Sequence, residues 1–322
     1  MDKNSASTNN LGLFVGGLAL LTAAAVILTA AVPQAIATTT AAWGQHVLTV
    51  FINTLPFLVL GSLTAGFLEQ FLTPQTITNQ LPRSPRGRLL AAALLGLVFP
   101  FGTVGIVPIA WVLHKKGLPA SLGVTFLLAA PAVNPISFLA TATTLGWGWA
   151  LFHLTAALLI AFCVGALANR LPLLASFHPA PPPNLAQPTS FTLRTFWSAV
   201  SQGSDLLLHF LAYFVVGCLL AAVWQTTPLT TTLIGTNQST LTSMIAILPI
   251  TFFAGTSSLT ASTATAAWSA GVTAIYLTLG TMLGITTVTT LTAVLKPRSL
   301  ALLLAIITFF SLLSGLLVTI FN

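Results

Sequence analysis

The chain has very few charged residues. Only 4% of its 322 residues are Asp, Glu, Lys or Arg, whereas about a quarter are charged in an ordinary soluble domain. So few charges do not cover the surface of a folded chain of this length in water, and 56% of the residues are hydrophobic. The composition therefore excludes a water-soluble globular protein and predicts an all-α polytopic membrane protein.

Acidic residues are the scarcest of all. Three of them, Asp2, Glu69 and Asp205, stand against ten Lys and Arg. Enzymes that work with paired carboxylates are excluded by this shortage, and no nucleophile–base pair is visible either. The basic residues are scattered among apolar runs and form no face that tracks phosphates, so nucleic acid is not an expected partner. We expect no enzymatic activity and no cofactor.

Cysteine is nearly absent as well. Cys163 and Cys218 lie in separate apolar runs, and there is no Cys-x-x-Cys motif. A disulfide framework or a thiolate metal site needs more cysteines or closer spacing. We expect both to be packing residues and predict no metal site.

What the chain does have is long apolar segments. A helix needs about 20 apolar residues to cross a bilayer. Nine segments qualify: Leu11–Val32, Val47–Leu72, Leu89–Leu113, Pro119–Leu145, Trp147–Ala168, Ser201–Trp224, Leu241–Trp268, Gly271–Leu295 and Leu300–Phe321.

The first segment also has features of a signal peptide. It is followed by Ala35-Ile36-Ala37, an A-x-A pattern, but its flank carries only Lys3 offset by Asp2, and its apolar run is long for a signal core. We expect an uncleaved helix, with cleavage of residues 1–37 as the alternative.

A proline-rich stretch divides the chain. Residues 171–187 contain five prolines and are expected to form an extended linker. The predicted organisation is an extra N-terminal transmembrane helix (1–45), a first membrane repeat (46–170), a Pro-rich cytoplasmic linker (171–193) and a second membrane repeat (194–322).

The two halves resemble each other. Phe101-Gly102-Thr103 interrupts one segment of the first half, and Ala254-Gly255-Thr256 interrupts one of the second. A further glycine, Gly117 or Gly271, follows 15 or 16 residues later. Interrupted helices in matching positions are typical of secondary transporters.

The basic residues predict the topology. If all nine segments cross, six basic residues lie on one side and four on the other. If Leu89–Leu113 and Leu241–Trp268 instead turn back as re-entrant hairpins, all ten lie on one side, which the positive-inside rule makes cytoplasmic. We predict seven transmembrane helices plus two re-entrant hairpins in two inverted repeats, with eight to nine full spans as the alternative. The predicted location is the cytoplasmic membrane, with the linker and basic loops in the cytoplasm.

Four places carry polar groups or interrupted backbone at membrane depth. Such groups are tolerated where they are buried in protein or line a cavity, so we expect a substrate-binding site near the midplane. Packing is the alternative, because Ser and Thr also bond to their own helix and Gly allows close contact. The candidates are Gly102, Thr103 and Gly105 at the first tip; Pro131, Asn134 and Pro135; Gly255, Thr256, Ser257 and Ser258 at the second tip; and Gly284 with Thr286.

Few ionisable residues lie within the segments. Asp205 and His209 are one helical turn apart and are candidates for ion coupling, with a solvated pair at the end of the span as the alternative. His46 and His153 are lone histidines near the ends of segments, where we expect interfacial positions.

Several motifs resemble those of the ArsP-like predicted permeases, a family that includes organoarsenical efflux permeases. The motifs are Pro100-Phe101-Gly102-Thr103-Val104-Gly105-Ile106-Val107-Pro108, Lys116-Gly117-Leu118-Pro119 and Leu127-Leu128-Ala129-Ala130-Pro131-Ala132-Val133-Asn134-Pro135. The resemblance covers roughly residues 45 to 322 and implies a permease fold.

The chain also departs from that family. Relatives often carry Cys-x-Cys-Gly at the first tip, where this chain has Gly102 and Val104. Acidic residues are usual in the second half of the family, where this chain has Gly284 and Thr286. The resemblance therefore implies the transporter architecture and not thiol-dependent metalloid transport.

The function predicted from the sequence is a permease that moves a small, weakly charged solute by alternating access between the hairpin tips. The alternative is a non-transporting membrane subunit or scaffold that kept the fold. The expected partners are a small-molecule solute and membrane lipid, and association into a homo-oligomer stays open.

Overall fold

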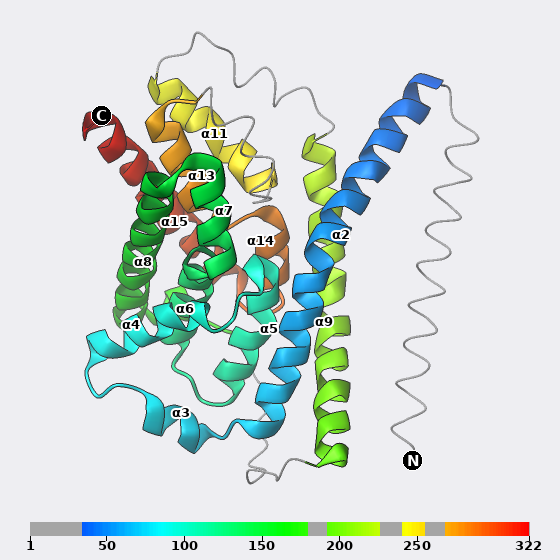
Figure 1. Ribbon diagram of the computed structural model, residues 1–322, viewed down its shortest axis with the longest axis vertical. Coiled ribbons are helices and arrows are strands. Elements are labelled where there is room, and N and C mark those ends of the chain that lie inside the picture. The colour runs from blue at the N-terminus through cyan, green and yellow to red at the C-terminus, as the bar shows by residue number, and fades with distance from the viewer. Residues whose placement is uncertain (1–33, 180–191, 226–239, 255–267, 322) are drawn as a thin grey trace.

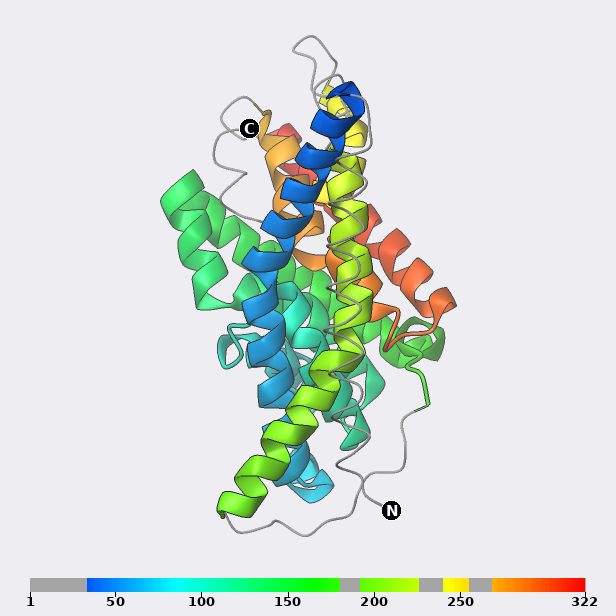
Figure 2. The same ribbon diagram turned by 90° about the vertical axis from the view of Figure 1, so that its right-hand side faces the viewer.

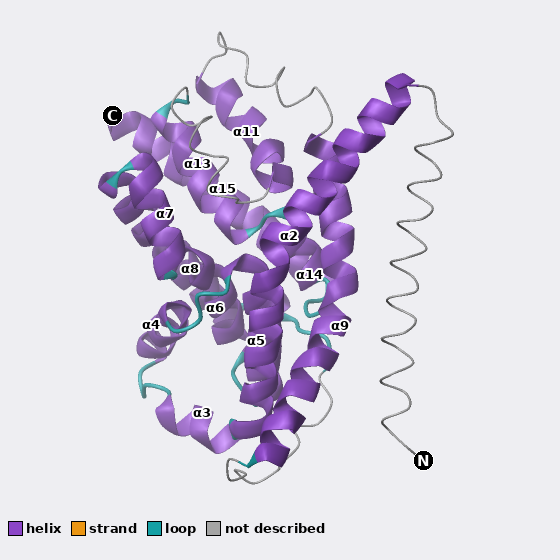
Figure 3. Cartoon of the chain, turned by 45° about the vertical axis from the view of Figure 1, so that its right-hand side comes forward, coloured by secondary structure: helices purple, strands orange, loops and turns teal. Residues whose placement is uncertain are grey.

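The structure is a computed structural model that describes residues 34–179, 192–225, 240–254 and 268–321. This part of the chain consists of helices joined by short connections and contains no named strand (Figure 3). An all-α polytopic architecture, predicted from the apolar runs, is confirmed.

The described residues of the first half form seven α-helices and two short 3-10 helices, and Figure 1 shows how they are arranged. They are α2 (Gln34–Phe71), α3 (Pro74–Gln80), α4 (Pro85–Leu94), η1 (Leu95–Leu97), α5 (Gly102–Lys115), α6 (Ala120–Val133), α7 (Pro135–Leu145), α8 (Trp147–Arg170) and η2 (Pro172–Ala175). The described helices of the second half are α9 (Leu193–Gln225), α11 (Thr240–Ala254), α13 (Ala270–Met282), α14 (Ile285–Leu291) and α15 (Pro297–Phe321).

Within the described residues five units are long and apolar enough to cross a membrane, and a sixth qualifies when a bent pair of helices is counted as one span. Five are α2, α8, α9, α15 and the stretch Ala270–Leu291 formed by α13 and α14, and the sixth is α6 with α7, which are bent by 41°. They coincide with six of the seven segments predicted to cross. The seventh, Leu11–Val32, lies outside the described residues, and the total number of spans stays a prediction.

The segment predicted as the first hairpin is not one continuous helix. It breaks between Leu97 and Gly102, where Gly102 has a φ of +63° that favours glycine. The arm that follows, α5, has 14 residues, or about 21 Å at 1.5 Å per residue, which falls short of the roughly 30 Å hydrocarbon core. Of the second predicted hairpin, only the part up to Ala254 is described.

Long helices from the two halves pack directly on each other. Helices α2 and α9 run side by side along much of their length (Figure 2). Glycines allow this contact: a β-carbon added at Gly66 would lie 2.7 Å from the Cα of Gly203. Helix α5 also packs against α2, and α14 packs against α9.

The start of the predicted linker is not extended, which corrects that part of the sequence interpretation. Residues 172–175 form the 3-10 helix η2, because proline is tolerated in the first turn of a helix. Ser176 and His178 then bond to the second half: Lys296 N donates to Ser176 O at 2.9 Å, and His178 N donates to Val294 O at 2.8 Å. Residues 180–191 of the linker lie outside the described residues.

The described basic residues gather at one end of the bundle, which we call the basic end. Contacts tie this end together: Lys115 reaches Glu69 in the last turn of α2, and His114 stacks on Phe177 at 4.1 Å, next to Ser176. Helix α8 ends at this end of the bundle, and helix α15 begins there. The residues of the basic end are Arg83, Arg86, Arg88, Lys115, Lys116, Arg170, Arg194, Lys296 and Arg298.

Candidate functional site

The first tip places an uncapped helix start inside the protein. Helix α5 begins at Gly102 and has no side-chain cap, so its first backbone N–H groups lack helical partners. Gly102 and Thr103 are half-buried. Gly105 has a packing role, because a β-carbon there would lie 2.9 Å from the carbonyl carbon of Phe57 on α2.

The break between α6 and α7 lies at Asn134. Its Oδ1 accepts hydrogen bonds from the backbone N–H of Ile136 at 2.7 Å and of Ser137 at 3.2 Å, which caps α7. The side chain is buried, with 4% of the residue exposed. Within the described chain its Nδ2 makes no hydrogen bond, so the amide keeps a free donor beside the cap.

The two prolines around Asn134 take different positions in the helices. Pro131 lies inside α6 and Pro135 is the first residue of α7. The helix therefore continues past Pro131, and Asn134 N still donates to Ala130 O at 3.2 Å. The helix itself ends after Asn134, because Pro135 has no N–H and disfavours a helical residue before it.

A second interior break separates α13 from α14 at Leu283 and Gly284. Gly284 precedes α14, which has no side-chain cap. Thr286 and Thr287 in the first turn are buried. The Thr287 hydroxyl oxygen has no hydrogen-bond partner in the described structure, so a buried donor is available at this break.

The structure brings the first tip close to the Asn134 break. A β-carbon at Gly96 would lie 2.9 Å from the side chain of Ala130, one helical turn before Asn134. Phe99 contacts Phe126 edge to face, with ring centroids 6.0 Å apart. Helix α14, with Thr286, packs against α5. Gly255, Thr256, Ser257 and Ser258 lie outside the described residues.

Asp205 and His209 do not form a unit. Both are exposed on α9, and no hydrogen bond joins them in the described part of the chain. The imidazole of His209 instead lies against the rings of Phe210 and Tyr213, with centroids 5.1 and 5.9 Å away.

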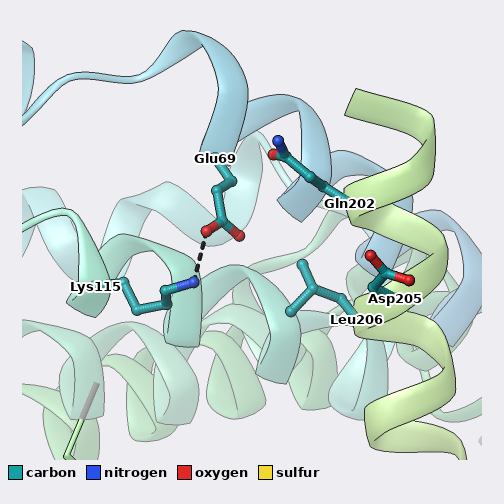
Figure 4. A pocket seen from close by; sticks show the side chains of 5 residues that line it. All are labelled: Glu69, Lys115, Gln202, Asp205 and Leu206. Carbon is teal, nitrogen blue, oxygen red and sulfur yellow. Dashed lines mark hydrogen bonds and ion pairs between the residues drawn. The ribbon is translucent and has the colours of Figure 1, made fainter. Parts of the chain in front are cut away.

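Asp205 lines a polar pocket of about 260 Å³ at the basic end (Figure 4). The other lining residues are Glu69, Lys115, Gln202 and Leu206. Lys115 Nζ donates to Glu69 Oε1 at 2.5 Å, which links α5 to α2. The pocket is separate from the two interior breaks, and the sequence gives no signal for the Glu69–Lys115 pair because 46 residues lie between its members.

Next to this pocket, burial and a neighbouring negative charge have opposite effects on the pKa of Lys116. Lys116 is almost completely buried at the end of α5. Burial lowers the pKa of its ammonium group, while the charge of Glu69 raises that pKa and the charge of Lys115 lowers it. The neighbouring Lys115 takes the direct ion pair with Glu69.

His153 was expected at the membrane interface, and the structure corrects this. It is 1% exposed, inside the protein. Its Nδ1 lies 3.4 Å from Thr141 Oγ1 on α7, and its Nε2 lies 3.1 Å from Thr281 Oγ1 on α13. Sequence spacing gives no hint of this contact, because 128 residues separate His153 from Thr281.

No group of three or more His, Cys, Asp or Glu side chains is close enough to hold a metal ion within the described ranges. Cys218 is buried in the core, whereas Cys163 is exposed on α8.

Two curated proteins are similar to this chain. The UPF0718 protein YcgR of Bacillus subtilis (strain 168) is 26% identical over 283 residues, which cover 84% of this chain and 95% of that protein. A protein of Streptococcus mutans, named as a putative two-component membrane permease complex subunit, is 36% identical over 122 residues, 37% of this chain and 40% of that protein. This match therefore spans less than half of that protein.

No solved structure matches the chain. The family ArsP_1, described as a predicted permease, matches residues 42–320. The match includes both interior helix breaks, the polar pocket and the contacts of His153. The chain therefore belongs to this permease family.

Proposed function

We propose that the chain is a permease of the cytoplasmic membrane, and that it moves a small, weakly charged solute through a site near the midplane. The observation that carries the proposal is the pair of interior helix breaks, at Asn134 and Gly284, within units long enough to cross the bilayer. Broken helices of this kind form the substrate sites of many secondary transporters.

The packing order supports two inverted repeats, 46–170 and 194–322. Helix α6 packs against α4 and α8, as α13 packs against α11 and α15. Helix α6 begins just after Lys116 and leads away from the basic end, whereas α14 ends just before Lys296 and leads toward it. The two broken units therefore run in opposite directions, as inverted repeats require.

The groups at the breaks favour a polar solute without strong charge. The start of α5, the Asn134 amide and the Thr287 hydroxyl offer donors. Pro131 and Pro135 lack N–H groups, so the carbonyls of Leu127 and Pro131 lose their helical donors and remain as acceptors. The chain supplies no charged side chain in either broken unit, which argues against a strongly ionic pocket.

In this mechanism the halves alternate between two arrangements that expose the site to either side of the membrane. The basic end faces the cytoplasm, in accordance with the positive-inside rule. Asp205, which lines the open pocket at that end, and His209 remain candidates for coupling.

A ligand screen on the purified chain in lipid nanodiscs tests the proposal. A ligand that binds the folded state raises the melting temperature by mass action. We expect a neutral polar compound to raise it in the wild type and not in Asn134→Ser, which keeps the capping oxygen and loses the amide donor. An equal shift in both proteins would contradict a site at Asn134.

One observation favours a second candidate, a subunit that works only with another protein. The Streptococcus mutans relative carries the name of a subunit of a two-component membrane permease complex. If no compound shifts the chain purified alone, whereas the same compounds shift it in native membranes, the two-component function is supported over the self-sufficient permease.

A further inference from the structure

His153 connects the two halves of the protein in the buried interior. It lies on α8 of the first half, beside Thr141 of α7, and it contacts Thr281 on α13 of the second half. We propose that His153 is a proton-binding site, and that its protonation is coupled to the relative movement of the two halves. The coupling rests on the proposed permease function, whereas the proton-binding site itself does not.

The two threonine hydroxyls beside His153 can each donate to a backbone carbonyl of their own helix. Thr281 Oγ1 donates to Leu277 O at 2.6 Å, and Thr141 Oγ1 donates to Ser137 O at 2.9 Å. A threonine hydroxyl has one hydrogen, and a backbone carbonyl only accepts. When each hydroxyl donates to its backbone carbonyl, its oxygen presents lone pairs to the imidazole, and both ring nitrogens then face an acceptor.

In this arrangement a neutral imidazole donates in only one of these two contacts, because it carries a single N–H. The shorter contact, from Nε2–H to Thr281 at 3.1 Å, is the one we expect in the neutral form. When hydronium transfers its proton, an N–H bond forms at Nδ1 and water is released. The new N–H points at Thr141, so the second hydrogen bond forms without a change of rotamer.

Titratable and charged groups on the surrounding helices do not neutralise the positive charge of a protonated His153. Helices α6 and α7 carry none. On α8 itself and on the other helices packed against it, the groups are Cys163, Arg170, Arg86, Arg88, Tyr276 and Arg298. None is a hydrogen-bond partner of the imidazole, and no carboxylate is among them.

This environment makes protonation depend on hydration. An imidazolium without a carboxylate partner is unfavourable in a dry interior. It becomes more favourable when water enters between α8 and α13. Proton binding therefore favours the arrangement in which the contact between the halves is open, and closure expels the proton. This link converts a proton gradient into movement of the halves.

The test uses the full chain in nanodiscs with 15N-labelled histidine. The 15N chemical shifts separate bare, N–H and doubly protonated imidazoles, and the signal missing in His153→Gln identifies His153. We expect one bare nitrogen at pH 9 and two N–H groups at acidic pH. Thr281→Val removes an acceptor that binds the charged form more strongly than the neutral form, so proton affinity should fall about tenfold. Thr155→Val, at an exposed threonine of α8 that bonds only to its own helix, is the matched control and should leave the titration unchanged.

Hydrogen exchange of the Ala270–Met282 segment measures the coupling. After correction for intrinsic rates, acidic pH should increase deuterium uptake in the wild type and not in His153→Gln. A His153 signal that stays neutral from pH 9 to pH 5, or that titrates identically in Thr281→Val, would overturn the inference. If His153→Gln does not fold, Thr281→Val still identifies the signal by its shift. Failure of the ligand screen would count against the permease and leave the titration result unaffected.

Discussion

The backbones of Gly61 on α2 and Gly105 on α5 lie directly against each other. A β-carbon added at Gly61 would come 2.7 Å from the Cα of Gly105, closer than real β-carbons approach backbone. Helix α2 and the arm after the first tip, α5, therefore meet without intervening side chains, as is common where membrane helices pack closely.

This contact predicts that Gly61→Ala destabilises the protein. The added methyl group must push α5 away from α2, and overpacking of this kind typically costs about 1–3 kcal/mol. Gly44→Ala, in the same helix, is the matched control, because nothing lies within 4 Å of its added β-carbon. The melting temperature in detergent should fall for Gly61→Ala and stay level or rise for Gly44→Ala, and similar values for both variants would contradict the close contact.

Loss of the cap at Asn134 should destabilise α7 in a graded way. Removal of a capping oxygen typically costs about 1 kcal/mol, and serine retains a capping oxygen. We expect Asn134→Ala to lower the free energy of unfolding by about that amount, and Asn134→Ser to remain near the wild type. Unfolding in a calibrated detergent–denaturant series measures both variants. A serine variant as unstable as the alanine variant would show that the cap is not what Asn134 contributes.

The ion pair between Glu69 and Lys115 should contribute a modest coupling energy. The two side chains are 22% and 15% exposed, so water screens the pair only in part. We expect about 1 kcal/mol of interaction in a double-mutant cycle with Glu69→Gln and Lys115→Met. Additive effects of the two substitutions would show that α2 and α5 are held together at the basic end by packing alone.

Cysteine labelling tests the re-entrant topology. In a background with Cys163→Ala and Cys218→Ala, the exposed positions Pro119 and Arg194 should both react from the cytoplasmic face. Trp147, between α7 and α8, should react only from the opposite face. A membrane-impermeant maleimide applied to right-side-out and inverted vesicles distinguishes the faces. Labelling of Pro119→Cys from outside would mean that the segment before it crosses the membrane completely.

Much of the fold was predictable because the bilayer imposes one length on every crossing helix. The apolar runs predicted the helices α8 and α15 within a few residues, and Pro135 predicted the break beside Asn134. The start of the linker was not predictable in the same way. Its prolines suggested an extended chain, but burial of Leu174 and Ala175 and the bonds to Val294 and Lys296 stabilise a compact turn.

The candidate site shows where sequence reasoning ends. Glycines, prolines and Asn134 in apolar segments are visible signals, because such residues disturb a helix wherever they occur. The partners of His153 carried no such signal. Thr141 and Thr281 are ordinary helical threonines, and only the packing of α7, α8 and α13 brings them to one imidazole.

The bonds between the segment after α8 and the start of α15 have a consequence for motion. Ser299 Oγ donates to Leu174 O at 2.7 Å and accepts from Ser176 N at 3.2 Å, next to the two backbone bonds of Ser176 and His178. Any rotation of one half against the other that keeps these bonds has its pivot at the basic end. Displacements then grow with distance from that pivot and are largest at the opposite end of the bundle, where α7 meets α8.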